Sequence, residues 1–303
     1  MDTDAVLTLL QDVAAEVINP RFRALANHEV QEKNPGDLVT IADHEAEVLI
    51  TKALQDAYPA AVILGEEAYA ADPTLADRFH QADHAFTVDP VDGTKNFVNG
   101  SPDHAVIASE IRNSEVTRAW IWQPQHEAAY VAERGSGAYL NGVKLQTQTP
   151  GDPLRGHTSR RAWLGRQLGD LPELKLTWVS CGIDYPHLIA GDADFLVYLG
   201  TQPWDHAPGA LLLHESGGYC GSLEGQPYRP VFGQSGLVAA GRRSTYDAVI
   251  ARRWAQVVEA VTDLAAALDS RVDTGATRAV ELNAAAVAAH LGGLGLTVPG
   301  SDL

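Results

Sequence analysis

The sequence predicts an α+β fold, because its helix patterns and strand patterns occur in groups and do not strictly alternate. The chain has 303 residues, of which 45% are hydrophobic and 20% charged, so it can bury a sizeable core. Several strand-like runs follow one another between residues 104 and 133. By length, we expect one large domain or two domains of about 150 residues each.

The first 90 residues combine two predicted helices with two predicted strands. Apolar residues recur at helical spacing over residues 6–18, and Pro20 then interrupts the pattern. Residues 43–58 repeat this spacing and predict a second helix. Short apolar runs predict strands at residues 61–64 and 85–88. We expect the second strand to stop at Asp89-Pro90.

The rest of the chain predicts further strands, a hairpin and a helix. The predicted strands are residues 105–111, 116–122, 129–132, 176–181, 195–199 and 237–240. Asn141-Gly142 lies between short apolar stretches and predicts a tight hairpin. A helix is predicted over residues 206–216, ended by Gly217-Gly218.

These elements divide into three predicted parts. Residues 1–150 form an N-terminal α+β subdomain, and residues 151–250 form a C-terminal α/β subdomain after a Pro- and Gly-containing connection. Residues 251–303 are an Ala-rich extension with two helical patterns, at 255–268 and 278–291. The extension carries no pattern that we can assign to chemistry, and we expect it to act in packing or oligomerisation.

Composition disfavours several classes of function. Asp and Glu number 39 and Lys and Arg number 22, which gives a formal charge of −17 and argues against nucleic acid or an anionic membrane as the main partner. Cys181 and Cys220 cannot build a disulfide framework or a four-ligand zinc site. The N-terminus carries acids where a signal peptide needs basic residues, and no stretch reaches the ~20 apolar residues of a membrane span. We therefore expect a cytoplasmic protein.

Acidic residues gather in four segments where predicted elements end or begin. The segments are residues 37–43, Gly65-Glu66-Glu67, residues 89–96 and Trp204-Asp205-His206. Each segment by itself has an ordinary structural explanation: a solvated loop, a turn or a helix N-cap.

The third of these segments, Asp89-Pro90-Val91-Asp92-Gly93-Thr94, is the most informative. Two carboxylates three residues apart on a tight turn can face one point, and the Val91 carbonyl between them adds a neutral oxygen. Gly93 and Thr94 then offer backbone N–H groups to an anion. Oxygen ligands beside phosphate donors are typical of magnesium sites that act on phosphate esters.

Two other phosphate-binding patterns fit less well. Haloacid-dehalogenase phosphatases use D-x-D-x-T after a strand, whereas two residues separate Asp89 from Asp92 here. A dinucleotide site needs G-x-G-x-x-G, and Gly135-Ser136-Gly137 lacks the third glycine.

The four acidic segments resemble the inositol monophosphatase family in their order and rough spacing. D-P-V-D-G-T, followed later by W-D-x-A-x-G, is highly specific, and the resemblance covers roughly residues 5 to 250, including the hairpin at residues 135–142. The resemblance implies a layered α-β-α-β-α sandwich and magnesium-dependent hydrolysis of phosphate monoesters. It also implies lithium inhibition and a homodimer.

The same resemblance implies a role for each matching residue. Glu66, Asp89 and the Val91 carbonyl would bind a first Mg²⁺, and Asp89, Asp92 and Asp205 a second. Glu66 would also hold waters of a weaker third ion. Mn²⁺ is the expected substitute metal.

Water activation and phosphate binding are implied for further residues. Asp43 and Thr94 would form a hydrogen-bonded pair that orients and deprotonates the attacking water, while the Gly93 and Thr94 N–H groups, together with Asp92, would contact the substrate. Lys33 resembles a basic residue on a loop over the site, although a solvated lysine is an equal alternative. No protein nucleophile is needed, and we expect His206 to be structural.

The alcohol part of the substrate is predicted less sharply, because the chain departs from the family pattern there. Asp184 falls in a segment that often reads Gly-Ser/Thr-Ala-Ala, and Tyr198 stands where inositol phosphatases often have glutamate. Asp184 could accept hydrogen bonds from sugar hydroxyls or attract an amine. Alternatively, it caps a helix while Tyr185 packs.

Several functions stay open at this point. An inositol monophosphate-like or sugar phosphate substrate is expected first. Histidinol phosphate, fructose 1,6-bisphosphate and 3′-phosphoadenosine 5′-phosphate are the alternatives within the family. A non-catalytic scaffold that keeps the fold is the alternative of another class, and the Ala-rich extension motivates it.

Overall fold

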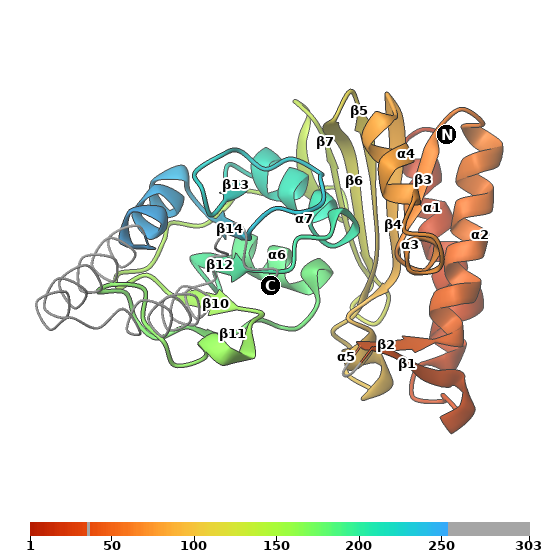
Figure 1. Cartoon of the computed structure of the whole chain (residues 1–303), viewed down its shortest axis with the longest axis horizontal. Helices are drawn as coiled ribbons and strands as arrows, with labels where there is room; N and C mark the ends of the chain where they lie inside the picture. Colours follow the sequence, from red (N-terminus) through yellow and green to blue (C-terminus); the bar gives the residue numbers. More distant parts are fainter. Residues whose placement is uncertain (35–36, 254–303) are drawn as a thin grey trace, which may run out of the picture.

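Two large β-sheets, with helices between them and on their outer faces, dominate the computed structural model, which describes residues 1–34 and 37–253 (Figure 1). The layers run from α1 and α2, through a seven-stranded sheet, to α6 and α7, and then to a five-stranded sheet. Helical residues 243–253 pack on the far side of the second sheet through Tyr246 and Val249. The predicted α-β-α-β-α sandwich is confirmed.

The larger sheet is mostly antiparallel. Its strands, in spatial order, are β3 (Val62–Gly65), β4 (His84–Asp92), β5 (Ala105–Arg112), β6 (Glu115–Gln123), β7 (Ala128–Glu133), β8 (Gly137–Leu140) and β9 (Val143–Lys144). Only β3 and β4 pair in parallel. The predicted hairpin joins β8 to β9, where Asn141 and Gly142 have φ angles of 48° and 80°. Both angles are left-handed, as a tight two-residue turn requires.

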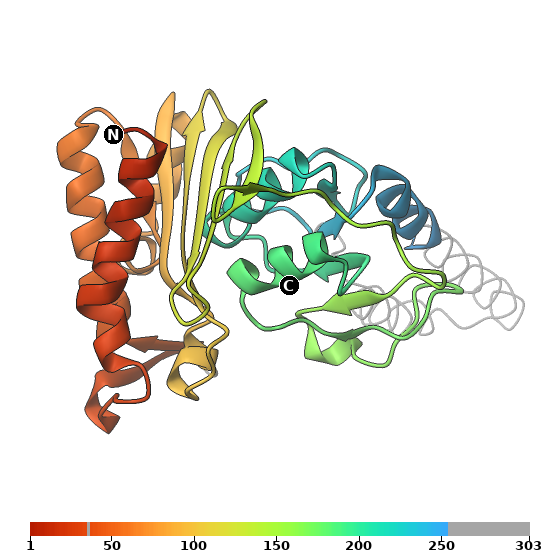
Figure 2. The same cartoon turned by 180° about the vertical axis from the view of Figure 1, so that it is seen from behind.

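Helices α1 (Thr3–Val13) and α2 (Ile41–Ala57) cover the outer face of this sheet (Figure 2). The Asp2 side chain caps α1 by accepting from Ala5 N at 2.8 Å. The helical path then continues through a π-helix (Ala14–Ile18) and a 3₁₀ turn (Asn19–Arg21) that contains Pro20. Fully buried Leu10, Ile50, Phe86 and Trp120 join both helices to β4 and β6 in one core cluster.

Helices α6 (Cys181–Ala190) and α7 (Pro203–Glu215) fill the space between the two sheets. Their buried side chains, such as Tyr185 and Leu211, share a core cluster with Ile107 of the larger sheet and Leu196 of the smaller one. The smaller sheet has the spatial order β11 (Lys175–Leu176), β10 (Gly156–Thr158), β12 (Phe195–Tyr198), β14 (Leu237–Ala240) and β13 (Tyr219–Ser222).

Strand β4 continues past the point at which the sequence predicts its end. Asp89 pairs with Ile107 and Asp92 with Ala105, so three steps on β4 correspond to two on β5. Pro90 has no N–H to donate to a ladder, and this bulge accommodates it. In a regular strand, residues three apart point to opposite faces. The extra residue restores the alternation, so Asp89 and Asp92 can share one face.

The predicted strand at residues 176–181 is wrong, since only Lys175 and Leu176 pair and α6 already begins at Cys181. Tertiary hydrogen bonds override the β propensity of this apolar run. Trp178 N donates to the Asp184 carboxylate at 2.7 Å, and Cys181 N donates to Asp92 at 3.1 Å. Val179 between them has a φ of 64°, which a β-branched residue rarely adopts.

Short elements complete the part of the chain that the structure describes. They are an antiparallel pair of strands, β1 (Val30–Asn34) and β2 (Asp37–Thr40), the helices α3 (Glu66–Ala71), α4 (Leu75–Gln81) and α5 (Thr94–Val98), and 3₁₀ turns at Asn27–Glu29 and Arg161–Trp163. Among the described residues, no helix combines the length and the apolar character that a membrane span requires. The two helices predicted within residues 254–303 lie outside the described residues.

Candidate metal centre

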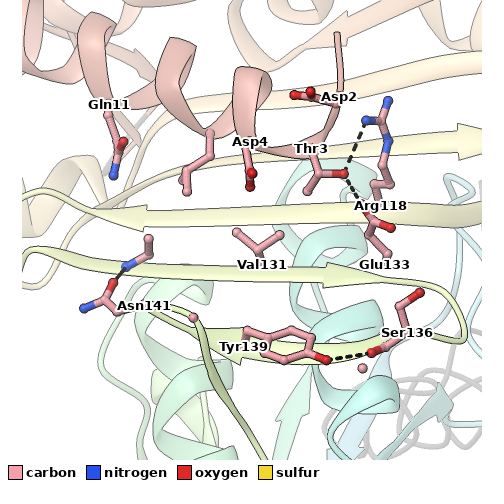
Figure 3. Close-up of a pocket in the computed structure, with 14 residues that line it drawn as sticks. Asp2, Thr3, Asp4, Gln11, Arg118, Val131, Glu133, Ser136, Tyr139 and Asn141 are labelled. Atoms are coloured by element: carbon pink, nitrogen blue, oxygen red, sulfur yellow. Dashed lines mark hydrogen bonds between the residues drawn. The ribbon is translucent and has the colours of Figure 1, made fainter.

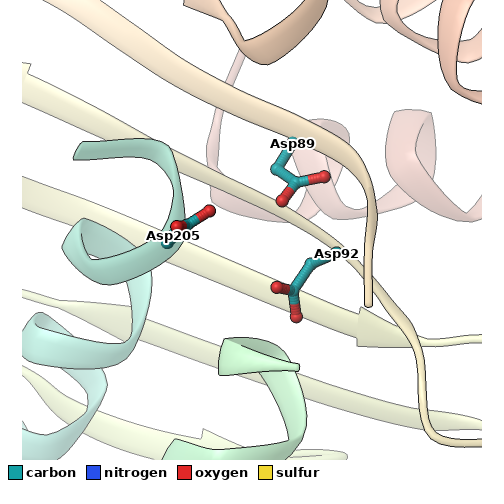
Figure 4. A group of neighbouring side chains, drawn as sticks. All are labelled: Asp89, Asp92 and Asp205. Carbon is teal, nitrogen blue, oxygen red and sulfur yellow. The ribbon is translucent and has the colours of Figure 1, made fainter. Parts of the chain in front are cut away.

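Three carboxylates from two different layers meet where the end of β4 faces α7 (Figure 4). Asp89 and Asp92 come from the bulged end of β4, and Asp205 comes from the first turn of α7. One oxygen of each lies within 4.8 Å of the other two. Asp89 and Asp92 are only 2% and 6% exposed. Hard divalent cations prefer a close group of carboxylate oxygens of this kind.

The negative charges of this trio, Asp89, Asp92 and Asp205, repel one another and would attract a cation. Burial raises the pKa of Asp89 well above its usual value, and the neighbouring carboxylates of Glu66, Asp92 and Asp205 raise it further. These causes all oppose a negative charge on Asp89, and a bound cation would reverse them.

Asp92 has a second task, because it joins β4 to the N-terminus of α6. One of its oxygens accepts from Cys181 N at 3.1 Å, and the other accepts from Gly182 N at 2.6 Å and from the Ser180 hydroxyl. These hydrogen bonds lower the pKa of Asp92, although burial raises it more. We therefore expect changes at Asp92 to affect stability as well as chemistry.

Glu66 lies beside the trio. It is half-buried, follows the last residue of β3 and is the first residue of α3. Its negative charge raises the pKa values of both Asp89 and Asp43, so it lies close enough to interact with each of them.

Asp43 and Thr94 meet across 51 residues of chain, as the sequence predicts. Thr94 Oγ1 lies 3.2 Å from Asp43 Oδ1 and 3.0 Å from the Val91 carbonyl oxygen, and it can donate to either. The other Asp43 oxygen accepts from Thr40 N at 2.9 Å and from Thr40 Oγ1 at 2.5 Å, which forms a capping box at the start of α2. Burial raises the pKa of Asp43 to about 7.

Gly93 lies between Asp92 and Thr94 in the chain and has a φ of 86°. This left-handed conformation turns the chain from β4 into α5, and a side chain here would also approach Ser180 Cβ to within 2.8 Å. The Gly93 and Thr94 N–H groups thus begin α5, as predicted.

Asp184 and Tyr198 do not lie where the sequence analysis predicts. Asp184 is 1% exposed and Tyr198 is 2% exposed. The Tyr198 hydroxyl donates to Asp184 at 2.9 Å, and Trp178 N donates to the same carboxylate. Both positions argue against contact with the substrate. Of the alternative, Tyr185 packs as expected, whereas Asp184 bonds Trp178 N and does not cap α6. Lys33 belongs to β1, but its side chain lies outside the described residues.

His206 is structural, as predicted. The ring is buried, with Nδ1 3.1 Å from the Tyr185 hydroxyl and Nε2 3.0 Å from the Gly200 carbonyl oxygen. Burial lowers its pKa to about 4, so the ring is neutral at pH 7. Of these two neighbours, Asp205 belongs to the trio and His206 does not.

Three residues that hold the site were missed in the sequence analysis. Thr40 fixes Asp43, Ser180 bonds Asp92, and Glu47 bonds the backbone that follows Glu66. Thr40 could have been found, because T-x-x-D before an apolar helix pattern is a capping signal. Ser180 has no local sequence signal of this kind, because its partner is 88 residues away.

A cavity outside the trio lies between α1 and strands β7 and β8 (Figure 3). Its volume is about 800 Å³, and it is lined by residues such as Leu7, Val131 and Tyr139. Arg118, Thr3 and Glu133 form hydrogen bonds at one end of it. None of the predicted site residues lines this cavity.

Comparison with known proteins agrees with this geometry. The model of the inositol monophosphatase family matches residues 2–258. The chain belongs to the inositol monophosphatase family. An inositol-1-monophosphatase of Rhizobium meliloti is 31% identical over 217 residues, which cover 67% of this chain and 79% of that protein. The family consists of metal-dependent phosphoric monoester hydrolases, and the chain is an enzyme of this class.

Other relatives of this family member carry different names or show the same fold. A protein of Pseudomonas aeruginosa named Nus factor SuhB is 29% identical over 78% of this chain and 90% of its own length. The solved structure of an IMPase (inositol monophosphatase) of Thermotoga maritima is 26% identical, with a TM-score of 0.71 over 84% of this chain and 97% of that one. A calcium-bound family protein of Staphylococcus aureus, 19% identical over 82% of this chain and 93% of its own, has a TM-score of 0.70 and the same fold.

Proposed function

We propose that this chain is a Mg²⁺-dependent phosphomonoesterase that hydrolyses a small phosphorylated alcohol by in-line attack of water. The observation that carries the proposal is the group of three carboxylates within 4.8 Å, next to the Asp43–Thr94 pair. The carboxylates suit divalent cations and the pair suits proton transfer, so the two chemical requirements of the reaction lie side by side.

The residues present fit a magnesium site. Asp89, Asp92, Asp205 and Glu66, with the Val91 carbonyl, would hold two to three ions, and Mn²⁺ would substitute. When bound, the cations supply positive charge to the phosphate and make water a stronger acid. The mutual repulsion of the buried carboxylates without a cation supports this role.

Asp43 and Thr94 move the proton in this proposal. Thr94 Oγ1 accepts a proton from the attacking water and passes its own to Asp43 Oδ1. The two hydrogen bonds from Thr40 hold Asp43 in place during the transfer. A pKa of about 7 before cations bind is close to the value at which a carboxylate can both take and release a proton near neutrality.

The substrate that we expect first is an inositol monophosphate or a sugar phosphate. The names of the Rhizobium meliloti and Bacillus subtilis relatives support this class. Histidinol phosphate, fructose 1,6-bisphosphate and 3′-phosphoadenosine 5′-phosphate are the alternatives. Phosphate would sit at the Gly93 and Thr94 N–H groups, beside Asp92. The homodimer, lithium inhibition and cytoplasmic location stay predictions.

A second candidate function is non-catalytic regulation through a protein or RNA partner. The observation that favours it is the name Nus factor carried by relatives from Pseudomonas aeruginosa and Escherichia coli. The two functions can coexist on one chain, and loss of hydrolysis without loss of partner binding would separate them.

The experiment that tests the first proposal is a phosphate-release screen. The panel holds inositol 1-phosphate, histidinol phosphate, fructose 1,6-bisphosphate and 3′-phosphoadenosine 5′-phosphate, each with Mg²⁺ and after exhaustive chelation. We expect at least one substrate to turn over with Mg²⁺ and none without. Asp43→Asn keeps the shape of the capping box, and it should lower kcat by about 10²- to 10⁴-fold while Mn²⁺ binding persists.

Two results would contradict the proposal. One is hydrolysis that survives chelation unchanged, which would remove the cation from the reaction. The other is an Asp43→Asn variant with wild-type kcat, which would remove Asp43 from proton transfer.

A further inference from the structure

Glu47 caps a helix that it does not belong to. Its side chain is carried by α2, is 5% exposed and reaches the start of α3. Glu47 Oε2 accepts from Glu67 N at 2.8 Å, and Oε1 accepts from Ala68 N at 2.7 Å. These are the second and third backbone N–H groups of α3, which an N-cap side chain normally satisfies. The N-cap residue of α3 is Gly65, which has no side chain, so Glu47 takes over this task.

Gly65 is needed for the space it leaves and not for its backbone conformation. Its φ is −91°, which any residue can adopt. A Cβ atom at Gly65 would lie 2.3 Å from Glu47 Cδ and 2.4 and 2.6 Å from the two carboxylate oxygens. Any larger residue would therefore displace the Glu47 carboxylate from the start of α3.

The position of Glu47 on α2 links two parts of the site. Glu47 lies four residues after Asp43, so both side chains leave the same face of the helix, one turn apart. Asp43 meets Thr94 while Glu47 holds the turn whose first residue is Glu66. One rigid helix thus fixes the Glu66-bearing turn relative to the Asp43–Thr94 pair.

We propose that Glu47 is a positioning residue that holds Glu66 in place for cation binding, with Gly65 providing the space for its carboxylate. The proposal rests on the role of Glu66 as a metal ligand in the proposed function. Glu47 itself bonds backbone N–H groups and need not touch the substrate. Residues that orient metal ligands typically change metal affinity or activity by about 10- to 100-fold when they are replaced.

The first test compares Glu47→Ala with Glu45→Ala by calorimetric titration with Mn²⁺ in the absence of substrate. Glu45 is a matched control, because it is the same residue type on the same helix, is exposed and pairs with Arg21. We expect Glu47→Ala to weaken Mn²⁺ binding by about 10-fold or more, and Glu45→Ala to leave it within 2-fold. The Mg²⁺ concentration for half-maximal turnover should rise in parallel for Glu47→Ala, while kcat at saturating Mg²⁺ recovers.

The second test uses the contact between Glu47 and Gly65. Gly65→Ala alone should weaken Mn²⁺ binding by a similar factor, because the new Cβ displaces the carboxylate. In a Glu47→Ala background the same change should add less than 2-fold, since no carboxylate remains to be displaced. A glycine needed only for its backbone would weaken binding equally in both backgrounds.

Circular dichroism establishes whether each variant is folded. If Glu47→Ala does not fold, Glu47→Gln, which keeps the side-chain volume, replaces it in both tests. Mn²⁺ affinity within 2-fold of wild type in the folded variant would overturn the proposal, and so would equal effects of Gly65→Ala in the two backgrounds. A wild-type protein that binds Mn²⁺ but releases no phosphate would instead overturn the proposed function, and the role of Glu47 would still be decided by Mn²⁺ binding.

Discussion

Replacing Asp89 by asparagine is expected to lower kcat by on the order of 10³-fold with Mg²⁺ present. Burial and the neighbouring carboxylates raise the pKa of Asp89 well above its usual value, and in the proposed function Asp89 is shared by two cations. Asparagine keeps the shape of the side chain and can still accept the bond from Val91 N, which is 3.1 Å from Asp89 Oδ1. The loss should therefore reflect the missing charge and not a damaged fold.

The same substitution should make the metal-free protein more stable at pH 8. Asp89 is buried among Glu66, Asp92 and Asp205. At pH 8 the unfolded chain carries this carboxylate charged in water, whereas the folded chain must either bury the charge or bind a proton, and both lower the free energy of unfolding. The asparagine side chain would be neutral in both the folded and unfolded chain, so this penalty would disappear. Thermal unfolding in EDTA checks it, with an Asp12→Asn change on the exposed surface as the control.

The activity and the stability of Asp89→Asn should move in opposite directions. A variant with wild-type turnover, or one that is less stable than wild type in EDTA at pH 8, would contradict the account. Asp92→Asn should differ, because Asp92 also bonds Ser180, Cys181 and Gly182, and we expect it to lose both activity and stability.

The metal-free wild-type protein should lose stability as the pH rises from 6.5 to 8.5. Burial raises the pKa values of Asp43 and Glu47 to about 7 and that of Asp184 to about 8. A carboxyl with a raised pKa stabilises the fold while it is protonated, and this contribution is lost as the pH rises through its folded pKa. Together these groups should change the free energy of unfolding by on the order of several kcal/mol.

The lower limit of this window is set by two buried histidines. The pKa values of His104 and His206 are lowered to about 4 by burial, so the neutral rings increase stability as the pH rises towards 6.5. Above pH 6.5 the histidines of the unfolded chain lose their remaining protons, so this gain levels off and the loss from the acids dominates.

Melting temperatures measured in EDTA at steps between pH 6.5 and 8.5 check this prediction. Added Mg²⁺ should reverse the part of the fall that comes from Asp43, because it would neutralise the charges around Asp89 and Asp43. Burial is the main cause of the raised pKa of Asp184 and the charge of Asp92 is a smaller one, so Mg²⁺ should restore only a small part of the Asp184 share. A melting temperature that is constant or rises across this window without metal would be inconsistent with the buried carboxyl groups.

The residues that the sequence predicts best are those with a local signal. Asp89, Asp92 and Thr94 belong to one short motif, and Asp205 follows a Pro and Trp at the start of a helix. Even for these residues, part of the prediction was wrong. Asp89 and Asp92 can share one face because of the bulge in β4, whereas the sequence predicts a shorter strand followed by a turn. The layered fold was predicted through the family resemblance and not from strand patterns alone.

Residues that act through distant partners could not be predicted. The start of α6 carries Gly182 and has Pro186 inside it, so local propensity argues against a helix there. It forms because Asp92, about 90 residues earlier, accepts its first N–H groups. Asp184 and Tyr198 look like substrate contacts when taken singly, yet their mutual hydrogen bond satisfies two buried polar groups.

Diffraction from crystals containing Mn²⁺, measured at the manganese absorption edge, tests the central claim most directly. The account predicts anomalous peaks between the carboxylates of Asp89, Asp92 and Asp205, with Glu66 beside them. Crystals of Asp89→Asn should lose at least one of these peaks. If wild-type protein releases phosphate only with Mn²⁺ and yet shows no peak at these carboxylates, the proposed metal centre is contradicted.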